Sequence, residues 1–212
     1  MSSSPDRPPR LDLDGLCFGW PEAPLFDGLS ARLAPGVVLV LGGDGRGKTT
    51  LLRLIAGELR PQAGAVRLDG RTPDDDPAAW RRAVLSAEAG AQAHEQRTPN
   101  EVFAEARRRW PAFDEAALAG LVEGLSLAPH LDKRFFMLST GSRRKALFAA
   151  ALAARAPVTL LDGPFAALDR PSSVALLHWM ADLAVRADRV LVVSGYEAPE
   201  GVHASAIVDL GD

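Results

Sequence analysis

Short apolar runs alternate with amphipathic stretches along most of the chain, as expected where strands alternate with helices. Runs rich in branched apolar side chains predict strands at residues 36–41, 158–161, 189–193 and 206–209. Residues 11–17 alternate apolar and polar side chains, which predicts an edge strand. Residues 65–70 predict another short strand, and residues 72–77, with three consecutive aspartates, predict a loop.

Helices are indicated by apolar spacing and by capping residues. Leucine and isoleucine recur at helical spacing over residues 49–59. Thr98 and Glu101 form a capping-box pattern with Pro99 between them, which predicts a helix running on to residue 109. Two further helices are expected to begin at the N-caps Asp114 and Ser139 and to end near residues 125 and 154, and another spans residues 172–183.

This order of elements predicts an α/β fold, a sandwich built around a mostly parallel sheet. Only helices are expected between residues 88 and 150, so this stretch is a candidate second lobe. The 212 residues fit one domain, at most a large core with a smaller lobe.

Composition narrows the class of protein only slightly. The chain is 24 % charged and 47 % hydrophobic with a net charge of −3, so composition gives no reason to expect a nucleic-acid partner. One cysteine, Cys17, excludes an internal disulfide. Residues 1–7 lack the apolar stretch of a signal peptide, and the longest apolar run, residues 146–154, is far shorter than the roughly 20-residue membrane span. We therefore expect a cytoplasmic protein that reaches a membrane only through a partner.

The most specific motif lies between the strand at residues 36–41 and the following helix. It reads G-x-x-x-x-G-K-[ST], the phosphate-binding loop of many nucleotide-binding proteins. Its glycines let backbone N–H groups point at phosphate oxygens, and the next helix adds its positive N-terminal end. Lys48 is expected to reach the β- and γ-phosphates and to serve catalysis, and the Thr49 hydroxyl to bind Mg²⁺. The predicted nucleotide-binding residues here are Gly42, Gly43, Asp44, Gly45, Arg46, Gly47, Lys48, Thr49 and Thr50.

A second acidic motif supports the same chemistry. The strand at residues 158–161 ends in Asp162, the position from which a carboxylate holds Mg²⁺ opposite the loop hydroxyl. Mg²⁺ usually keeps several waters, so one hydroxyl and one carboxylate suffice from the protein. Together the two motifs predict a binder of ATP and Mg²⁺, but kinases, GTPases, helicase-like motors and transport ATPases all share them.

Three further segments select a family. Residues 138–142, Leu-Ser-Thr-Gly-Ser, resemble the Leu-Ser-Gly-Gly-Gln signature of ATP-binding cassette proteins. Residues 164–169 resemble the D-loop of that family and end in Asp169. Phe18-Gly-Trp20-Pro is similar to the segment whose aromatic residue stacks on adenine, with a half-buried packing role for Trp20 as the alternative. From residue 11 to 210 the chain resembles an ABC-transporter ATP-binding subunit, similar in length to short haem-exporter-type cassettes.

The resemblance implies an architecture and partners. A phosphate-loop NTPase sandwich would comprise a RecA-like core at residues 11–87 and 155–210, with a small antiparallel β subdomain, and an all-helical lobe at residues 88–150. Two cassettes would pair head to tail, so that Ser139 and Gly141 bind ATP held by the opposite subunit, with Asp169 nearby. A transmembrane permease would hold the pair at the cytoplasmic face of the membrane, and ATP-dependent closing of the pair would drive transport.

The sequence departs from the family pattern at positions that serve hydrolysis. Gly163 stands where the family has a glutamate that polarises the attacking water, and Gly195 where it has a histidine. Alignment puts Glu88 at the Q-loop glutamine, although Gln92 is close by. Glu88 is the candidate substitute that could bind Mg²⁺ or hold a water, with a solvated side chain as the alternative. Glu197 and the more distant His203 are weaker candidates.

Two functions remain open from these residues. A positioned general base contributes about 10²–10⁴ in rate, so a cassette without one is expected to bind ATP and to hydrolyse it slowly. The alternative is a degenerate regulatory cassette that closes on ATP without efficient hydrolysis. DNA-repair ATPases with related heads are disfavoured because the chain has no sustained heptad run. A small-molecule kinase would have no use for the signature-like segment.

Overall fold

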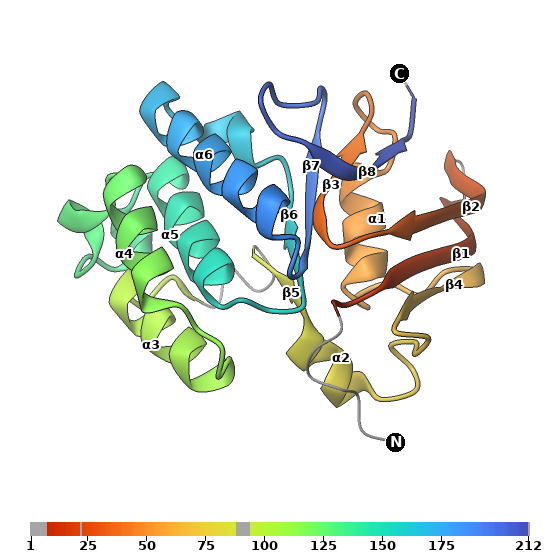
Figure 1. Ribbon diagram of the computed structural model, residues 1–212, viewed down its shortest axis with the longest axis horizontal. Helices are drawn as coiled ribbons and strands as arrows, with labels where there is room; N and C mark the ends of the chain where they lie inside the picture. The colour runs from red at the N-terminus through yellow and green to blue at the C-terminus, as the bar shows by residue number, and fades with distance from the viewer. Residues whose placement is uncertain (1–7, 22, 88–93, 212) are drawn as a thin grey trace.

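The computed structural model describes residues 8–21, 23–87 and 94–211 and contains two sheets (Figure 1). The larger sheet is parallel throughout, in the order β5 (Val84–Ser86), β6 (Val158–Leu161), β7 (Val190–Gly195), β3 (Gly36–Leu41), β8 (Ala204–Asp209). The smaller sheet is antiparallel, in the order β2 (Ala23–Leu33), β1 (Leu11–Trp20), β4 (Ala63–Leu68). The predicted α/β class, with a parallel core sheet and a small antiparallel one, is confirmed.

Helices cover both faces of the parallel sheet. The α-helices in the described part of the chain are α1 (Lys48–Ile55), α2 (Pro77–Ala83), α3 (Pro99–Arg109), α4 (Glu115–Gly124), α5 (Thr140–Ala153) and α6 (Arg170–Arg186). Figure 1 shows α3 to α6 gathered on one side of the sheet and α1 on the other, next to the antiparallel sheet. Helices α3, α4 and α5 pack together between residues 99 and 153, with α6 beside them.

Strand β3 is fixed from both faces because its side chains alternate between two apolar clusters. Val37 and Leu39 belong to the cluster that contains the buried residues of α5 and α6. Val38 and Val40 belong to the cluster shared by α1 and the antiparallel sheet. All four are essentially inaccessible to solvent. The loop that follows β3 consequently begins from a rigid position.

One local expectation is wrong, and one strand was not expected. Residues 11–17 were expected at a sheet edge, but β1 lies between β2 and β4 and pairs with both. Alternation of apolar and polar side chains indicates that one face of a strand is buried, but it does not indicate how many neighbouring strands pair with it. The neighbour β2 escaped prediction because most of its side chains are exposed, as expected for the outer strand of a small sheet. The loop expected over residues 72–77 is confirmed for residues 72–76, and α2 begins at its last residue, Pro77.

The predicted N-caps form as expected. Thr98 Oγ1 accepts from the backbone N–H of Glu101 at 3.3 Å, and the Glu101 carboxylate accepts from the N–H of Thr98 at 2.8 Å. This reciprocal pair is the capping box. Asp114 accepts from Ala117 N at the start of α4, and the Ser139 hydroxyl accepts from the backbone N–H of Ser142 at the start of α5.

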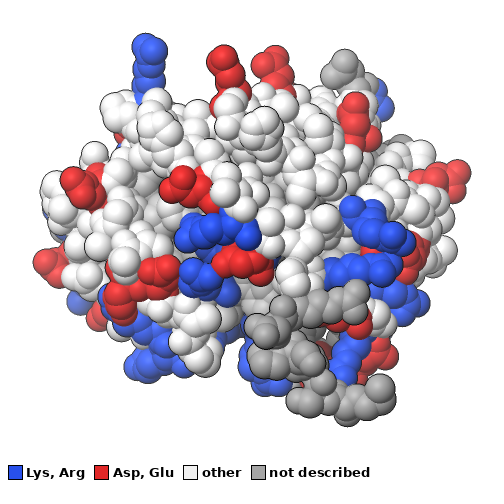
Figure 2. All heavy atoms as spheres, in the orientation of Figure 1, with Lys and Arg blue, Asp and Glu red and all other residues white. Residues whose placement is uncertain are grey.

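The surface carries charges of both signs. Figure 2 shows Lys and Arg side chains interspersed with Asp and Glu side chains on the face it presents. Exposed ion pairs in the structure include Arg107 with Glu115 at 2.5 Å and Arg60 with Asp74 at 2.8 Å. None of the helices described combines the length and the apolar character needed to cross a membrane.

Candidate functional site

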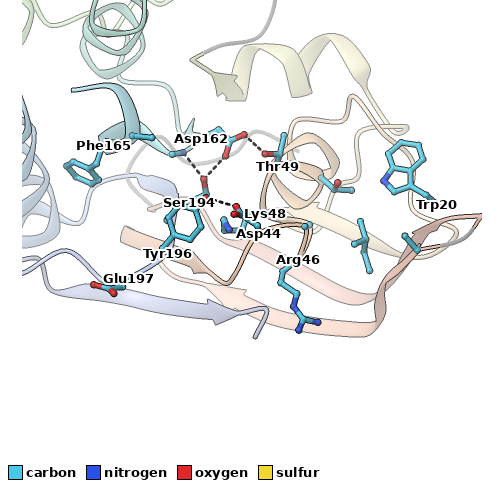
Figure 3. Close-up of a pocket in the computed structure, with 18 residues that line it drawn as sticks. Trp20, Asp44, Arg46, Lys48, Thr49, Asp162, Phe165, Ser194, Tyr196 and Glu197 are labelled. Atoms are coloured by element: carbon cyan, nitrogen blue, oxygen red, sulfur yellow. Dashed lines mark hydrogen bonds between the residues drawn. The ribbon is translucent and has the colours of Figure 1, made fainter. Parts of the chain in front are cut away.

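A pocket of about 760 Å³ opens where the parallel strands reach their carboxyl ends (Figure 3). Its walls come from the loop between β3 and α1, from the segments that follow β6 and β7, and from the turn between β1 and β2. Small-molecule sites in open α/β sheets occur at this edge, and their volumes commonly fall between about 300 and 1,000 Å³. Segments far apart in sequence thus converge on one site.

The loop before α1 has the backbone of a phosphate-binding loop. Gly47 stands immediately before α1 with φ +91°, and a Cβ there would lie 2.9 Å from the Phe26 ring, so the position requires glycine. Lys48 is the first residue of α1, and its Nζ donates to the carbonyl oxygens of Gly42 and Gly43, each at 2.6 Å. The predicted loop residues from Asp44 to Thr50 line the pocket, whereas Gly42 and Gly43 contribute these carbonyls from behind.

Thr49 and Asp162 lie together, as their motifs predict. The Thr49 hydroxyl donates to Oδ2 of Asp162 at 2.6 Å, although 113 positions separate the two residues. The hydroxyl of Ser194, from β7, donates to Oδ1 of the same carboxylate at 2.6 Å. Thr49 and Asp162 supply hard oxygen donors, the chemistry that suits Mg²⁺. The described residues hold no cluster of three or more His, Cys, Asp and Glu side chains.

The position after Asp162 has no side chain but a closely held backbone. Gly163 adopts φ 51° and ψ 50°, and its N–H donates to Ser194 Oγ at 2.8 Å. Arg144, from α5, donates to the carbonyl oxygens of Asp162 at 2.5 Å and Gly163 at 3.2 Å. A Cβ built on Gly163 would meet nothing within 4 Å. At Gly195, a Cβ would make only an ordinary contact, 3.4 Å from the Glu197 carbonyl oxygen.

Tyr196 is a site residue that the motif search did not find. Its ring centroid lies 4.4 Å from Lys48 Nζ, and its hydroxyl donates to Oδ1 of Asp44 at 2.5 Å. The hydrogen bond to the Asp44 carboxylate raises the pKa of Tyr196 above its usual value. The only available signal was an aromatic residue next to Gly195, at the end of a buried strand that borders the phosphate loop.

Trp20 lines the same pocket, close to the β1–β2 turn and away from Tyr196 (Figure 3). Its side chain is 49 % exposed and meets the Phe18 ring edge-on, with ring centroids 5.3 Å apart. The geometry is compatible with the adenine-stacking role predicted for this residue.

The other predicted residues lie elsewhere. Ser139 and Gly141 stand at the exposed beginning of α5, outside the pocket. Asp169 caps α6 and forms an ion pair with Lys145, whose hydrogen bond holds the pKa of Asp169 well below its usual value. Glu88 and the neighbouring Gln92 fall outside the described residues. Glu197 is at the pocket margin, where Figure 3 shows it turned away from Asp162, and His203 does not line the pocket.

Comparisons with known proteins agree with this geometry. The family model described as "ABC transporter" matches residues 26–166, which include the phosphate loop, the signature-like segment and Asp162. The cytochrome c biogenesis ATP-binding export protein CcmA of Rhodopseudomonas palustris is 35 % identical over 184 residues, covering 85 % of this chain and 88 % of that protein. The CcmA of Aromatoleum aromaticum is 33 % identical over 192 residues, covering 89 % of each chain.

Solved structures show the same fold at lower identity. A structure entitled "Structure of ATP binding subunit of ABC transporter" matches with a TM-score of 0.76 and 22 % identity, over 88 % of this chain and 79 % of that one. An ABC transporter ATP-binding protein from Pyrococcus furiosus, itself described as putative, has the same TM-score and 20 % identity, over 95 % and 97 % of the two chains.

Proposed function

The chain belongs to the ABC transporter family as an ATP-binding subunit, and we propose that it binds ATP with Mg²⁺ in the pocket of Figure 3 and hydrolyses it slowly to drive a membrane partner. The observation that carries the proposal is the hydrogen bond between Thr49 and Asp162, at the beginning of α1 and the end of β6. It joins the two halves of an NTPase site across 113 positions of sequence. A glycine-rich turn with a chance lysine would have no such acidic partner.

Each part of the pocket has a role in the bound complex. The backbone N–H groups of the phosphate loop and the N-terminus of α1 would hold the phosphates. Lys48 would exchange its two carbonyl acceptors for phosphate oxygens, which carry full negative charge and make stronger hydrogen bonds. Trp20 would stack on the adenine at the other end of the pocket.

Thr49 and Asp162 would hold the magnesium ion, through the hydroxyl and carboxylate oxygens that already lie 2.6 Å apart. When bound, this ion neutralises negative charge on the phosphates and fixes their orientation. Ser194 occupies the other carboxylate oxygen of Asp162 and so orients that side chain. Thr49 and Asp162 would contact the ion directly, whereas Ser194 would act by holding the Asp162 carboxylate and the Gly163 N–H in place.

Slow hydrolysis is expected because the end of the site that would activate water has no base among the described residues. Gly163 and Gly195 stand where the family carries a glutamate and a histidine. Lys48 and the helix N-terminus still stabilise charge on the transferring phosphate, which is the larger electrostatic contribution to phosphoryl transfer. Binding requires neither of the missing side chains.

A second cassette and a membrane permease are the proposed partners, at the cytoplasmic face of the membrane. The curated relatives named above are ATP-binding export proteins. The first turn of α5 supports pairing, because Ser139 and Gly141 lie outside the pocket with the helix N-terminus accessible. A phosphate held by a second copy could meet those N–H groups, as at other helix N-termini.

Phosphate release by the purified chain with ATP and Mg²⁺ tests the proposal, together with ATP binding by calorimetry. Lys48→Ala removes the phosphate-facing ammonium, and Lys133→Ala, at an exposed position before Phe135, is the matched control. We expect slow release that Lys48→Ala abolishes and Lys133→Ala preserves. ATP binding without any phosphate release would favour the degenerate regulatory cassette. Absence of both binding and release would contradict the proposal.

A further inference from the structure

Three charged or polar side chains meet at the phosphate-loop end of the pocket. The Tyr196 ring covers the Lys48 ammonium at 4.4 Å, and its hydroxyl donates to the Asp44 carboxylate at 2.5 Å. Figure 3 shows these three side chains grouped beside Ser194. Tyr196 is 64 % exposed, so these contacts, rather than burial in the core, determine its position.

Asp44 poses an electrostatic problem in this place. It lies inside the loop whose N–H groups face phosphate oxygens, and an ionised carboxylate has acceptors but no donor. A carboxylate turned towards a bound phosphate would repel it without any compensating hydrogen bond. The repulsion would be strongest for the phosphate nearest to Lys48, which is the terminal one in a triphosphate.

The hydroxyl of Tyr196 removes this conflict. It has a single proton to donate, and that proton is engaged by Oδ1 of Asp44. The bond draws the carboxylate towards β7 and partly neutralises it, while the ring face stabilises the Lys48 ammonium by a cation–π contact. Tyr196 thereby contacts two side chains of opposite charge, the Asp44 carboxylate and the Lys48 ammonium.

We propose that Tyr196 is a positioning residue that makes the site select triphosphate over diphosphate nucleotides, by holding the Asp44 carboxylate away from the terminal phosphate and keeping Lys48 in front of it. The inference rests on the proposed function and deepens it by assigning the recognition of the third phosphate. Tyr196 acts through Asp44 and Lys48. A tyrosine that only covered the surface would leave the preference for triphosphate unchanged when altered.

Calorimetry with the non-hydrolysable imido analogue of ATP and with ADP, both with Mg²⁺, tests this assignment. Tyr196→Phe keeps the ring and removes the hydroxyl, freeing the Asp44 carboxylate. We expect the affinity for the triphosphate to fall about three- to tenfold and that for ADP to fall less than about twofold. Adding Asp44→Asn removes the liberated charge and should return the ratio of the two affinities to the wild-type value.

Glu197→Gln is the matched control for this rescue. It removes another carboxylate at the margin of the same pocket, one that Figure 3 shows turned away from Asp162. In the Tyr196→Phe background, Glu197→Gln should leave the lowered ratio of triphosphate to ADP affinity unchanged. Equal rescue by Glu197→Gln would show a general charge effect and would overturn the assignment, as would a wild-type ratio in Tyr196→Phe itself.

A spectroscopic measurement follows Tyr196 directly, because it is the only tyrosine in the chain. Ring-labelled tyrosine gives a single set of NMR signals, expected to shift with the triphosphate analogue and to shift less with ADP. Signals that respond equally to both nucleotides would contradict the assignment. Absence of all nucleotide binding by the wild type would instead overturn the proposed function, so the two failures are distinguishable.

Discussion

The two sides of the nucleotide pocket are built very differently. On the phosphate-loop side, Lys48 and Thr49 carry functional groups that are already held by hydrogen bonds of 2.6 Å. On the side formed by the ends of β6 and β7, Gly163 and Gly195 present only backbone. Under the proposed function, the phosphate-loop side therefore carries the side chains for binding, and the strand side, in the part of the chain that the structure describes, lacks a side chain at the two positions where the family resemblance places a glutamate and a histidine.

Under the proposed function, ATP binding and the activation of water therefore draw on different parts of one pocket. The strand ends keep their structural hydrogen bonds, since Ser194 links Asp162 to the backbone of Gly163. Substitutions on the phosphate-loop side should consequently change ATP affinity, whereas substitutions on the strand side should change turnover.

The largest expected effect comes from introducing a general base at Gly163, on the side of the pocket formed by the ends of β6 and β7. Gly163→Glu should raise turnover about 100-fold, the lower end of what a positioned general base contributes. The space for its side chain is open, but the left-handed backbone at this position costs roughly 1–2 kcal/mol of stability. Phosphate release measures the effect. Gly163→Gln carries the same strain without the carboxylate, and equal rates in the two variants would contradict the interpretation.

On the loop side, Thr49→Ala should remove most of the advantage that Mg²⁺ gives to ATP binding. The variant loses the hydroxyl that faces Asp162, so we expect the ratio of ATP affinities with Mg²⁺ and with EDTA to fall about tenfold. Thr50→Ala, in the next position of the same helix, should keep the ratio. Equal loss in both variants would argue against Thr49 as the metal ligand.

Ser194→Ala should act mainly on stability. The side chain is buried and bonds both to Asp162 and to the N–H of Gly163, so its loss leaves two polar groups without this partner. We expect a decrease of about 1–2 kcal/mol in the free energy of unfolding, measured by denaturant titration. Ser173→Ala, at a partly exposed position on α6, should change it by less than about 0.5 kcal/mol.

The smallest effect concerns the ionisation of Tyr196. Its pKa is raised by the hydrogen bond to Asp44, so the phenol should ionise at a higher pH than free tyrosine. Any stability from that bond is complete below the ordinary tyrosine pKa and is lost as the pH rises through the raised value. Ultraviolet titration of this single tyrosine measures the midpoint, and Asp44→Asn should lower it towards the ordinary value. A midpoint unaffected by Asp44→Asn would contradict this cause.

Sequence patterns predicted the parts of the fold that local chemistry determines. The capping box at Thr98 and Glu101 formed because both hydrogen bonds lie within one helical turn. The phosphate loop and Asp162 were predictable because each ends a run of buried strand residues. The outer strand β2 was missed because most of its side chains face solvent, which weakens the apolar pattern. Helix α2 had a usable signal in Asp76, an N-cap that precedes Pro77.

The site itself was only partly predictable. Lys48, Thr49 and Asp162 belong to motifs whose spacing carries their chemistry, and the structure brings them together. Tyr196 and Asp44 are 152 positions apart, and no local pattern says that a tyrosine after β7 will reach the loop after β3. Their contact follows from the adjacency of these two strands in the sheet, which is a property of the tertiary fold.

The contact of Arg144 with the end of β6 has a mechanical consequence. This residue lies near the beginning of α5, and its guanidinium donates hydrogen bonds to two successive backbone carbonyls, those of Asp162 and Gly163. Much of the rest of that helix is packed among apolar side chains. A displacement of the beginning of α5 would therefore also disturb these two hydrogen bonds, so that the helix start and the end of β6 are mechanically linked.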